Sequence, residues 1–387
     1  MKSWDKIKEI ILQFRGLTTI GITDVVGNAI SAFFWFYIAA ILGAEHYGRI
    51  SYYLSIASIA STISLLGAQN TIIVYSAKNV RIQGVVYFIS IIFGTITSIV
   101  LFLFFYNLGV SVYILGTVIF GLASSEILGK KLYISYAKYI IAQRILMVGL
   151  SVGLYYLLGP NGVILGIGLS YLLYISRIHM GFKESKIDFS ILKPRFGFMM
   201  HNYALKIAES AFSSVDKLLI APLIGFTLLG NYQLGLQFLS VLQLLPSIVF
   251  RYTLPHDASG NVNKKLKKLT ILTSVVFTIL GITLSPIIVP SMFPKFDAAV
   301  GVIQIVSLSL VPISINLAYV SKFLGNEKSK VVLANSIIAV VVQIIAIIIL
   351  GRTFGVNGVA AAFVLAITGE TIFYATMNRF IKYPNKI

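Results

Sequence analysis

The sequence of 387 residues contains no cysteine, only 13 acidic residues and only 4 histidines. Without cysteine, disulfides, thiolate metal sites and thiol nucleophiles are excluded. The histidines are too dispersed along the chain to predict a metal site, and no GxxxxGKS/T loop for ATP phosphates occurs. No paired-acid site appears in a polar loop. We therefore expect no enzymatic activity, no cofactor and no bound metal.

The main feature of the sequence is instead a series of long apolar stretches. Hydrophobic residues make up 57% of the chain and charged residues 11%, far from the balance of a soluble protein. A bilayer core of about 30 Å needs roughly 20 apolar residues per helix, and such stretches recur throughout. We predict an all-α polytopic membrane protein of about twelve transmembrane helices, over 16–42, 47–71, 82–106, 109–130, 136–158, 161–181, 197–222, 227–251, 267–291, 299–322, 329–351 and 356–380.

The basic residues alternate between the two ends of these helices. If the N-terminus lies inside, 26 of the 31 Lys and Arg residues fall in or near inward loops. This bias predicts that both termini are cytoplasmic, in a plasma or inner membrane. It also explains the formal charge of +18, so we expect no nucleic-acid partner. The basic segment 1–15 lacks an apolar core and a cleavage site, so no removable signal peptide is expected.

Two glycine-centred turns each occur twice in the sequence. LGAEHYG at Leu42–Gly48 is answered by IGFTLLG at Ile224–Gly230, at an offset of 182 residues. GPNGVILG at Gly159–Gly166 is answered by GVNGVAAA at Gly355–Ala362. The repeat predicts two six-helix lobes related by a pseudo-twofold axis, with a substrate site between them near mid-membrane. We place the lobes at 1–182 and 197–387, joined by a cytoplasmic linker at 183–196.

These turns and the twelve-helix layout resemble the polysaccharide (oligosaccharide-lipid) flippases of the multidrug, oligosaccharidyl-lipid and polysaccharide exporter superfamily. The resemblance extends over essentially the whole chain, and its motifs are loose turns. It implies a transporter that flips an oligosaccharide, linked to a polyisoprenoid pyrophosphate or phosphate, by alternating access. Such a flippase serves surface polysaccharide or glycan biosynthesis, and its partners are the lipid-linked substrate and the bilayer. We expect it to work as a monomer.

Polar residues on four helices suggest where the substrate binds. A charge at the bilayer centre costs at least about 2.5 kcal/mol, so it needs a partner or a wet cavity. Lys206 and Glu209 share one face of the seventh predicted helix, and Asp24 corresponds to Lys206 at the offset of 182. Basic groups suit a phosphate because charge-assisted hydrogen bonds are roughly twice as strong as neutral ones. The predicted substrate-binding residues are Lys206, Arg144, Arg49, Asn28, Ser55, Gln233 and Gln237.

Each of these residues also has a structural interpretation. Small polar residues bond across helix interfaces in membranes, which would explain the serines. Lys206 and Glu209, three residues apart, would form an internal ion pair, and Arg49 would anchor its helix at the interface. Glu126 lies within one turn of its helix end and is expected to snorkel to water. Both interpretations remain open from the sequence.

Acids within the predicted helices suggest coupling to Na⁺ or H⁺. The candidates are Asp24, Glu209 and Glu370. A cation-coupled exporter of drugs or toxins is therefore the alternative function, favoured by Asp24 and Glu370 and disfavoured by Lys206 and Arg144. A polysaccharide polymerase or ligase of the membrane is expected to carry a long external loop. The predicted external loops here have about eight residues or fewer, which disfavours that class.

Overall fold

The computed structural model describes residues 2–258, 263–326 and 328–381. In these ranges the chain forms helices and short connections, without strands. The elements are α1 (Lys2–Leu42), α2 (Ala44–Leu65), α3 (Ala68–Ala77), α4 (Gln83–Phe105), α5 (Leu108–Gly129), α6 (Tyr133–Leu158), α7 (Pro160–Ser170), η1 (Tyr171–Tyr174), α8 (Ile175–Glu184), α9 (Phe189–Leu192), η2 (Lys193–Arg195), α10 (Phe196–Ile224), α11 (Phe226–Leu242), α12 (Leu244–Ala258), α13 (Lys264–Met292), α14 (Ala299–Ser307), α15 (Leu310–Gly325) and α16 (Ser329–Phe380).

The helices confirm a polytopic membrane protein. Within the described ranges, 7 helices are long and apolar enough to cross a membrane, and three bent pairs bring the number up to 10. α16 is 52 residues long and reverses at Gly355, so it supplies two spans. α10, with 29 residues, is also long enough, although Lys206, Glu209 and Lys217 make it more polar. These additions reach the predicted number of about twelve.

Three predicted helices are broken where the sequence suggested continuity. α2 and α3 meet at 46°, α11 and α12 at 49°, and α14 and α15 at 41°. The first break has a backbone cause, because Leu66 and Gly67 both adopt positive φ values, of 50° and 76°. Pro246 and Pro312 lie in the first turns of α12 and α15, where a proline is tolerated. Because a proline interrupts the interior of a helix, α11 and α14 cannot continue unbroken past these positions.

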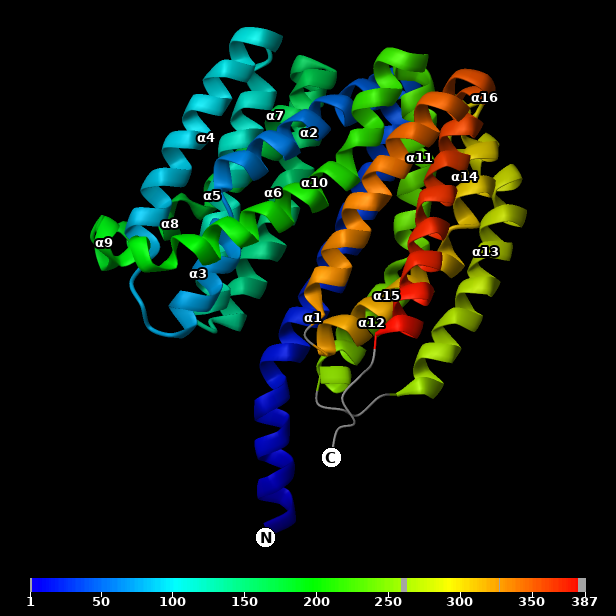
Figure 1. The fold of residues 1–387 in the computed structure, drawn as a ribbon. Coiled ribbons are helices and arrows are strands. Elements are labelled where there is room, and N and C mark those ends of the chain that lie inside the picture. The colour runs from blue at the N-terminus through cyan, green and yellow to red at the C-terminus, as the bar shows by residue number, and fades with distance from the viewer. Residues whose placement is uncertain (1, 259–262, 327, 382–387) are drawn as a thin grey trace. The chain divides into compact units, whose positions relative to one another are not determined.

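The chain divides into two compact units. The first unit comprises Met1–Phe34 and Ile56–Ser210. Its α5 packs against α3, α4, α6 and α7 (Figure 1). Ile72, Tyr87, Leu122 and Tyr174 are completely buried in its apolar core. The lobe boundaries derived from the sequence repeat stay a prediction.

The second unit comprises Trp35–Ser55 and Ala211–Ile387. In it α14 contacts α11, α13 and α16. The two arms of α16 run back alongside each other (Figure 1). The segment 35–55 carries the end of α1 and the start of α2 into this unit, where the rings of Tyr47 and Phe296 lie 6.0 Å apart. Tyr232, Val306 and Ile347 are completely buried in its core.

The turns of the sequence repeat have matching backbones. Gly159 begins α7 with φ 66° and ψ −152°, and Gly355 divides α16 with φ 58° and ψ −139°. A Cβ added at Gly162 would lie 2.1 Å from the carbonyl oxygen of Leu154, and one at Gly358 would lie 1.9 Å from that of Leu350. Only glycine fits these sharp reversals without strain. The internal repeat is therefore confirmed at this turn.

The other pair of repeated turns meets within the second unit. A Cβ added at Gly48 would lie 2.0 Å from the carbonyl oxygen of Phe226, and one at Gly230 would lie 1.9 Å from that of Ala44. Each glycine therefore allows the backbone of the other repeat to approach. Close approach through small residues is the usual way in which membrane helices gain packing contacts. The starts of α2 and α11 are thus held together backbone against backbone.

Replacing Gly230 by alanine is expected to destabilise the protein. The added Cβ would meet a carbonyl oxygen rather than a flexible side chain, and overpacking of this kind costs about 1–3 kcal/mol or more. A lower melting temperature of the purified protein in detergent checks this. The control is Gly149→Ala in α6, where nothing lies within 4 Å of an added Cβ. Equal melting temperatures of the two variants would contradict the backbone contact.

Candidate substrate and ion sites

Arg144 is the most distinctive cation of the first unit. It lies in α6, inside a candidate membrane span. Its guanidinium Nη1 donates a weak hydrogen bond to the Met147 sulfur at 3.8 Å. Its Nε is buried and has no hydrogen-bond partner, and no carboxylate in the described ranges forms an ion pair with it. A guanidinium in a membrane span therefore keeps most of its hydrogen-bonding capacity unused.

Three tyrosine hydroxyls lie within electrostatic range of this guanidinium. Tyr113 of α5 and Tyr171 and Tyr174 of η1 all lie close enough to Arg144 to interact with its charge. The hydroxyl of Tyr174 is buried without a hydrogen-bond partner. Hydroxyls and a guanidinium are all donors, so this arrangement fits an anion with several oxygens. The sequence prediction named Arg144 alone, because the tyrosines come from distant segments that only the fold brings together.

The first helix packs against α6 near Arg144. Gly27 faces α6, since a Cβ added there would lie 3.8 Å from the Nε of Arg144. Asn28 follows it and is exposed, and Asp24 lies one turn earlier and is partly buried. The structure thus places Gly27 against Arg144, whereas the predicted substrate residue Asn28 lies on an adjacent, exposed face of α1.

Two other predicted cations already have partners. Lys206 donates to the Glu209 carboxylate at 2.6 Å, which is the internal ion pair that the spacing in α10 predicts. Arg49 pairs with Glu45 at 2.8 Å, and its guanidinium carbon lies 5.0 Å from the centre of the Phe226 ring. In this conformation their charges are compensated within their own units. Their roles in binding substrate stay predictions.

The polar residues of α2 and α11 differ from one another. Ser55 is buried, and its hydroxyl donates to the carbonyl of Ser51 in the same helix at 2.8 Å. Such a bond satisfies the hydroxyl without a partner helix or a ligand. In α11, Gln237 is partly exposed, and the buried carbonyl oxygen of Gln233 has no hydrogen-bond partner. Gln233 thus retains unused capacity, whereas Ser55 does not.

Glu370 belongs to a polar cluster in the second unit. Its Oε2 accepts a hydrogen bond from Asn316 of α15 at 3.1 Å, and Thr371 donates to the Asn316 carbonyl oxygen at 2.7 Å. No basic side chain in the described ranges forms an ion pair with Glu370. Nearby Asn335 is completely buried, and its amide lies beside the hydroxyl of Tyr374. The prediction found Glu370 but missed Asn316 and Asn335, although both are amides within apolar stretches.

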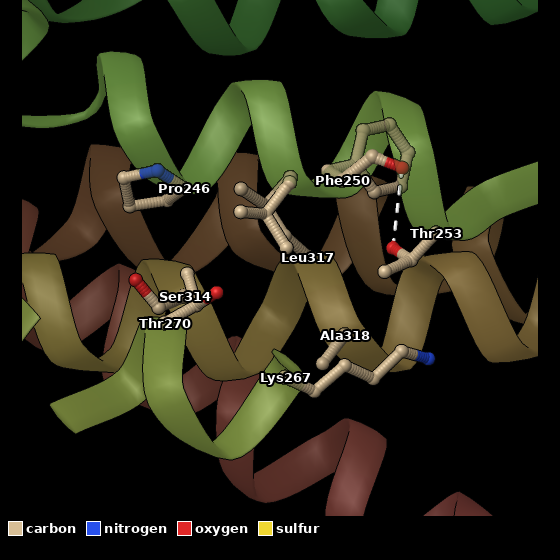
Figure 2. A pocket seen from close by; sticks show the side chains of 9 residues that line it. Pro246, Phe250, Thr253, Lys267, Thr270, Ser314, Leu317 and Ala318 are labelled. Carbon is tan, nitrogen blue, oxygen red and sulfur yellow. Dashed lines mark hydrogen bonds between the residues drawn. The ribbon is translucent and has the colours of Figure 1, made fainter. Parts of the chain in front are cut away.

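A small cavity lies between α12, α13 and α15. Figure 2 shows Thr253, Lys267, Thr270 and Ser314 among the residues that line it. The space of about 10 Å³ in it has room for about one water molecule. Lys267 also bonds the buried carboxylate of Asp257. This cavity is too small for a sugar, and it sits beside a charge pair that the sequence analysis did not anticipate.

Glu126 corrects the expectation that it would snorkel to water. Its side chain is completely buried, and it pairs with Lys130 at 2.6 Å and with Arg177 at 3.6 Å. Lys130 also binds Glu184, so two acids and two bases compensate one another. The reason is tertiary packing, because α8 closes over the end of α5 and supplies Arg177 and Glu184.

Comparisons with known proteins agree with this fold. A family model described as lipid II flippase MurJ matches residues 227–386, which is less than half of the chain. The structure titled lipid II flippase MurJ in an inward closed conformation is 16% identical, with 96% of this chain and 87% of that chain covered and a TM-score of 0.63. An inward-facing multidrug resistance MATE transporter of the MOP superfamily is 14% identical, with 94% and 97% covered and a TM-score of 0.61. No curated protein sequence matches the chain.

The chain has the fold of the MOP transporters. The resemblance to a flippase family of this superfamily, predicted from the repeated turns, is confirmed by the family model and the MurJ structure. The MATE and MurJ structures are similar to this chain to nearly the same degree. The fold therefore does not decide whether this chain transports a drug or a lipid-linked substrate. That choice depends on the chemistry of the sites.

Removing the lysine partner of Asp257 is expected to destabilise the second unit. Asp257 is buried, it accepts from Ser321 at 2.5 Å, and its second oxygen has no partner. Lys267→Met leaves this carboxylate uncompensated, a change that typically costs about 3–5 kcal/mol. The measurement is chemical unfolding in detergent.

The matched control is the double variant Lys267→Met with Asp257→Asn. It carries no buried charge, so it is expected to recover most of the lost free energy of unfolding. A double variant less stable than Lys267→Met alone would show that the ion pair is not the source of the effect.

Proposed function

We propose that this multi-pass membrane protein is a flippase for a lipid-linked oligosaccharide. The observation that carries the proposal is the guanidinium of Arg144, which lies in a membrane span without a carboxylate partner and among tyrosine hydroxyls. A pyrophosphate or phosphate supplies the oxygens that these donors lack. The family model named for a lipid II flippase supports the same class of substrate.

The proposed mechanism is alternating access. The phosphate and sugar head crosses through a hydrated path. Hydrogen bonds from Arg144 replace some of those that the phosphate made to water. The polyisoprenoid tail stays in the hydrocarbon, which spares the cost of moving it through a polar path. No bond is made or broken, so the protein acts as a transporter and not as an enzyme. Lys206, Arg49, Gln233 and Gln237 are proposed as further contacts during the cycle, after exchange of their present partners.

The proposed setting is the plasma or inner membrane, with both termini in the cytoplasm. The distribution of 26 of the 31 basic residues toward one side supports this orientation. In this orientation the proposed flippase would take its substrate from the cytoplasmic leaflet and present the glycan outside. We propose that one copy of the chain is sufficient, because the repeat supplies both halves of a transporter.

Coupling to Na⁺ or H⁺ is proposed at Glu370, with Asp24 and Glu209 as the other candidate acids. A bare carboxylate within a membrane is costly, so an acid without a basic partner either carries a proton or holds a cation. Asn316 and Thr371 provide oxygen and hydroxyl groups beside Glu370. The same observation favours the second candidate function, a cation-coupled multidrug exporter.

Flipping in proteoliposomes tests the role of Arg144. A lipid-linked oligosaccharide is placed in the inner leaflet, and an external glycosidase counts the heads that reach the outside. Arg144→Gln is expected to slow flipping by about tenfold or more, since a hydrogen bond to a charged group is worth roughly 1.5–3 kcal/mol. Arg144→Lys should recover part of the rate because it keeps the charge and loses the planar donors.

The control for this assay is Arg352→Gln, which removes an exposed arginine in α16. It is expected to flip at the rate of the wild type. Normal flipping by Arg144→Gln would remove Arg144 from the site and keep the function. No protein-dependent flipping of any lipid-linked sugar, together with cation-driven export of drugs, would establish the exporter instead.

Gradients imposed across the same vesicles test the coupling. If a Na⁺ or pH gradient accelerates wild-type flipping, Glu370→Gln is expected to abolish that acceleration, because an amide neither ionises nor balances a cation. Asp24→Asn and Glu209→Gln are measured in parallel to assign the effect among the three acids. Full gradient dependence in all three variants would exclude these acids as the coupling groups.

A further inference from the structure

Three lysines without partners in the described ranges lie close together in sequence around the end of α8. Lys183 lies in the last turn of that helix, and Lys186 and Lys193 follow in the segment that leads through α9 to α10. All three are exposed, and their ammonium groups form no hydrogen bond or ion pair in the described ranges. The acids nearby are already engaged. Glu184 pairs with Lys130, and Asp188 caps α9 by accepting from the amide of Ser190 at 2.9 Å.

Asp188 bonds to Ser190 and forms no ion pair with the three lysines in the described ranges. Its Oδ1 also accepts from the hydroxyl of Ser190 at 2.6 Å, and this bond lowers the pKa of the Asp188 carboxyl below its usual range. Both bonds are accepted by the same oxygen at the start of α9, where a carboxylate is favoured. The three lysines therefore present a local excess of positive charge.

Apolar side chains alternate with these lysines. Ile187 and Phe189 are 47% and 55% exposed, and the Phe189 ring lies 6.4 Å from that of Phe88 in α4. Phe88 begins a row of exposed apolar residues on one face of α4 that includes Ile92 and Ile96. Because α4 is a membrane span, that face is covered by lipid. The apolar patch of the linker is continuous with it.

The segment is held firmly against α4. The amide of Gly84 donates to the Ser185 hydroxyl at 3.1 Å, and that hydroxyl donates to the carbonyl of Arg81 at 2.7 Å. A Cβ added at Gly84 would lie 2.3 Å from the carbonyl oxygen of Ser185, so the two backbones are in contact. The backbone between Lys183 and Lys186 is thus fixed at the end of a span before any ligand binds, which lowers the ordering cost of binding.

We propose that Lys183, Lys186 and Lys193, with Ile187 and Phe189, bind the headgroup of an anionic phospholipid in the adjacent leaflet. The lysines meet the phosphate while the apolar side chains insert beside the acyl chains. A lysine near an anionic membrane surface contributes about 1 kcal/mol, so three together make a selective surface. This inference requires the bilayer and is independent of which cargo the protein moves.

Native mass spectrometry of the purified full chain tests this surface. The probe is phosphatidylglycerol titrated into detergent, with phosphatidylcholine as the neutral lipid. The wild type is expected to retain phosphatidylglycerol over phosphatidylcholine. The triple variant Lys183→Gln, Lys186→Gln, Lys193→Gln is expected to bind phosphatidylglycerol at least tenfold more weakly, with an unchanged melting temperature, because all three side chains are exposed.

The matched control is Lys264→Gln, Lys265→Gln, Lys268→Gln at the start of α13, which removes the same charge from three exposed lysines. It is expected to change the affinity less than twofold. Equal weakening in both triple variants would show attraction by net charge alone and would overturn the proposal. Unchanged affinity in the first variant, or binding of a polyisoprenyl pyrophosphate without phosphatidylglycerol, would overturn it as well.

Discussion

A charged group in a bilayer must be compensated, and this constraint accounts for ion pairs that hold the structure together. Lys206 meets Glu209, Asp257 meets Lys267, and Glu126 meets Lys130. Each pair ties helices or helix turns that apolar packing alone would leave free to slide, since lipid tails are as apolar as the side chains. The membrane thus makes electrostatic partners part of the architecture.

The same constraint gives meaning to the exceptions. Arg144 and Glu370 lie in different units, have opposite charges and lack an ion-pair partner among the described residues. A protein that had only to be stable would lose little by replacing either with an apolar side chain. Their presence within spans is the reason for proposing partners from outside, an anion for Arg144 and a cation or proton for Glu370.

The sequence predicted the helices and the repeat well, because both depend on local patterns. Apolar length marks a span, and glycine marks a turn that no other residue tolerates, as at Gly159 and Gly355. The break at Leu66 was missed because leucine gives no signal of a left-handed backbone. The partners of Arg144 and Asp257 were missed for another reason. They lie on segments far apart in sequence, and only packing decides which side chains converge.

The contact between Gly48 and Gly230 restricts how the two halves of the gene can diverge. Duplicated segments usually drift apart, since each copy is free to change while the other keeps its role. Here each copy presses its own main-chain carbonyl against the glycine of the other, and a carbonyl cannot be mutated away to make room. Neither half can therefore acquire a side chain at this position alone, and a chimaera that exchanges one half with a relative must preserve both glycines.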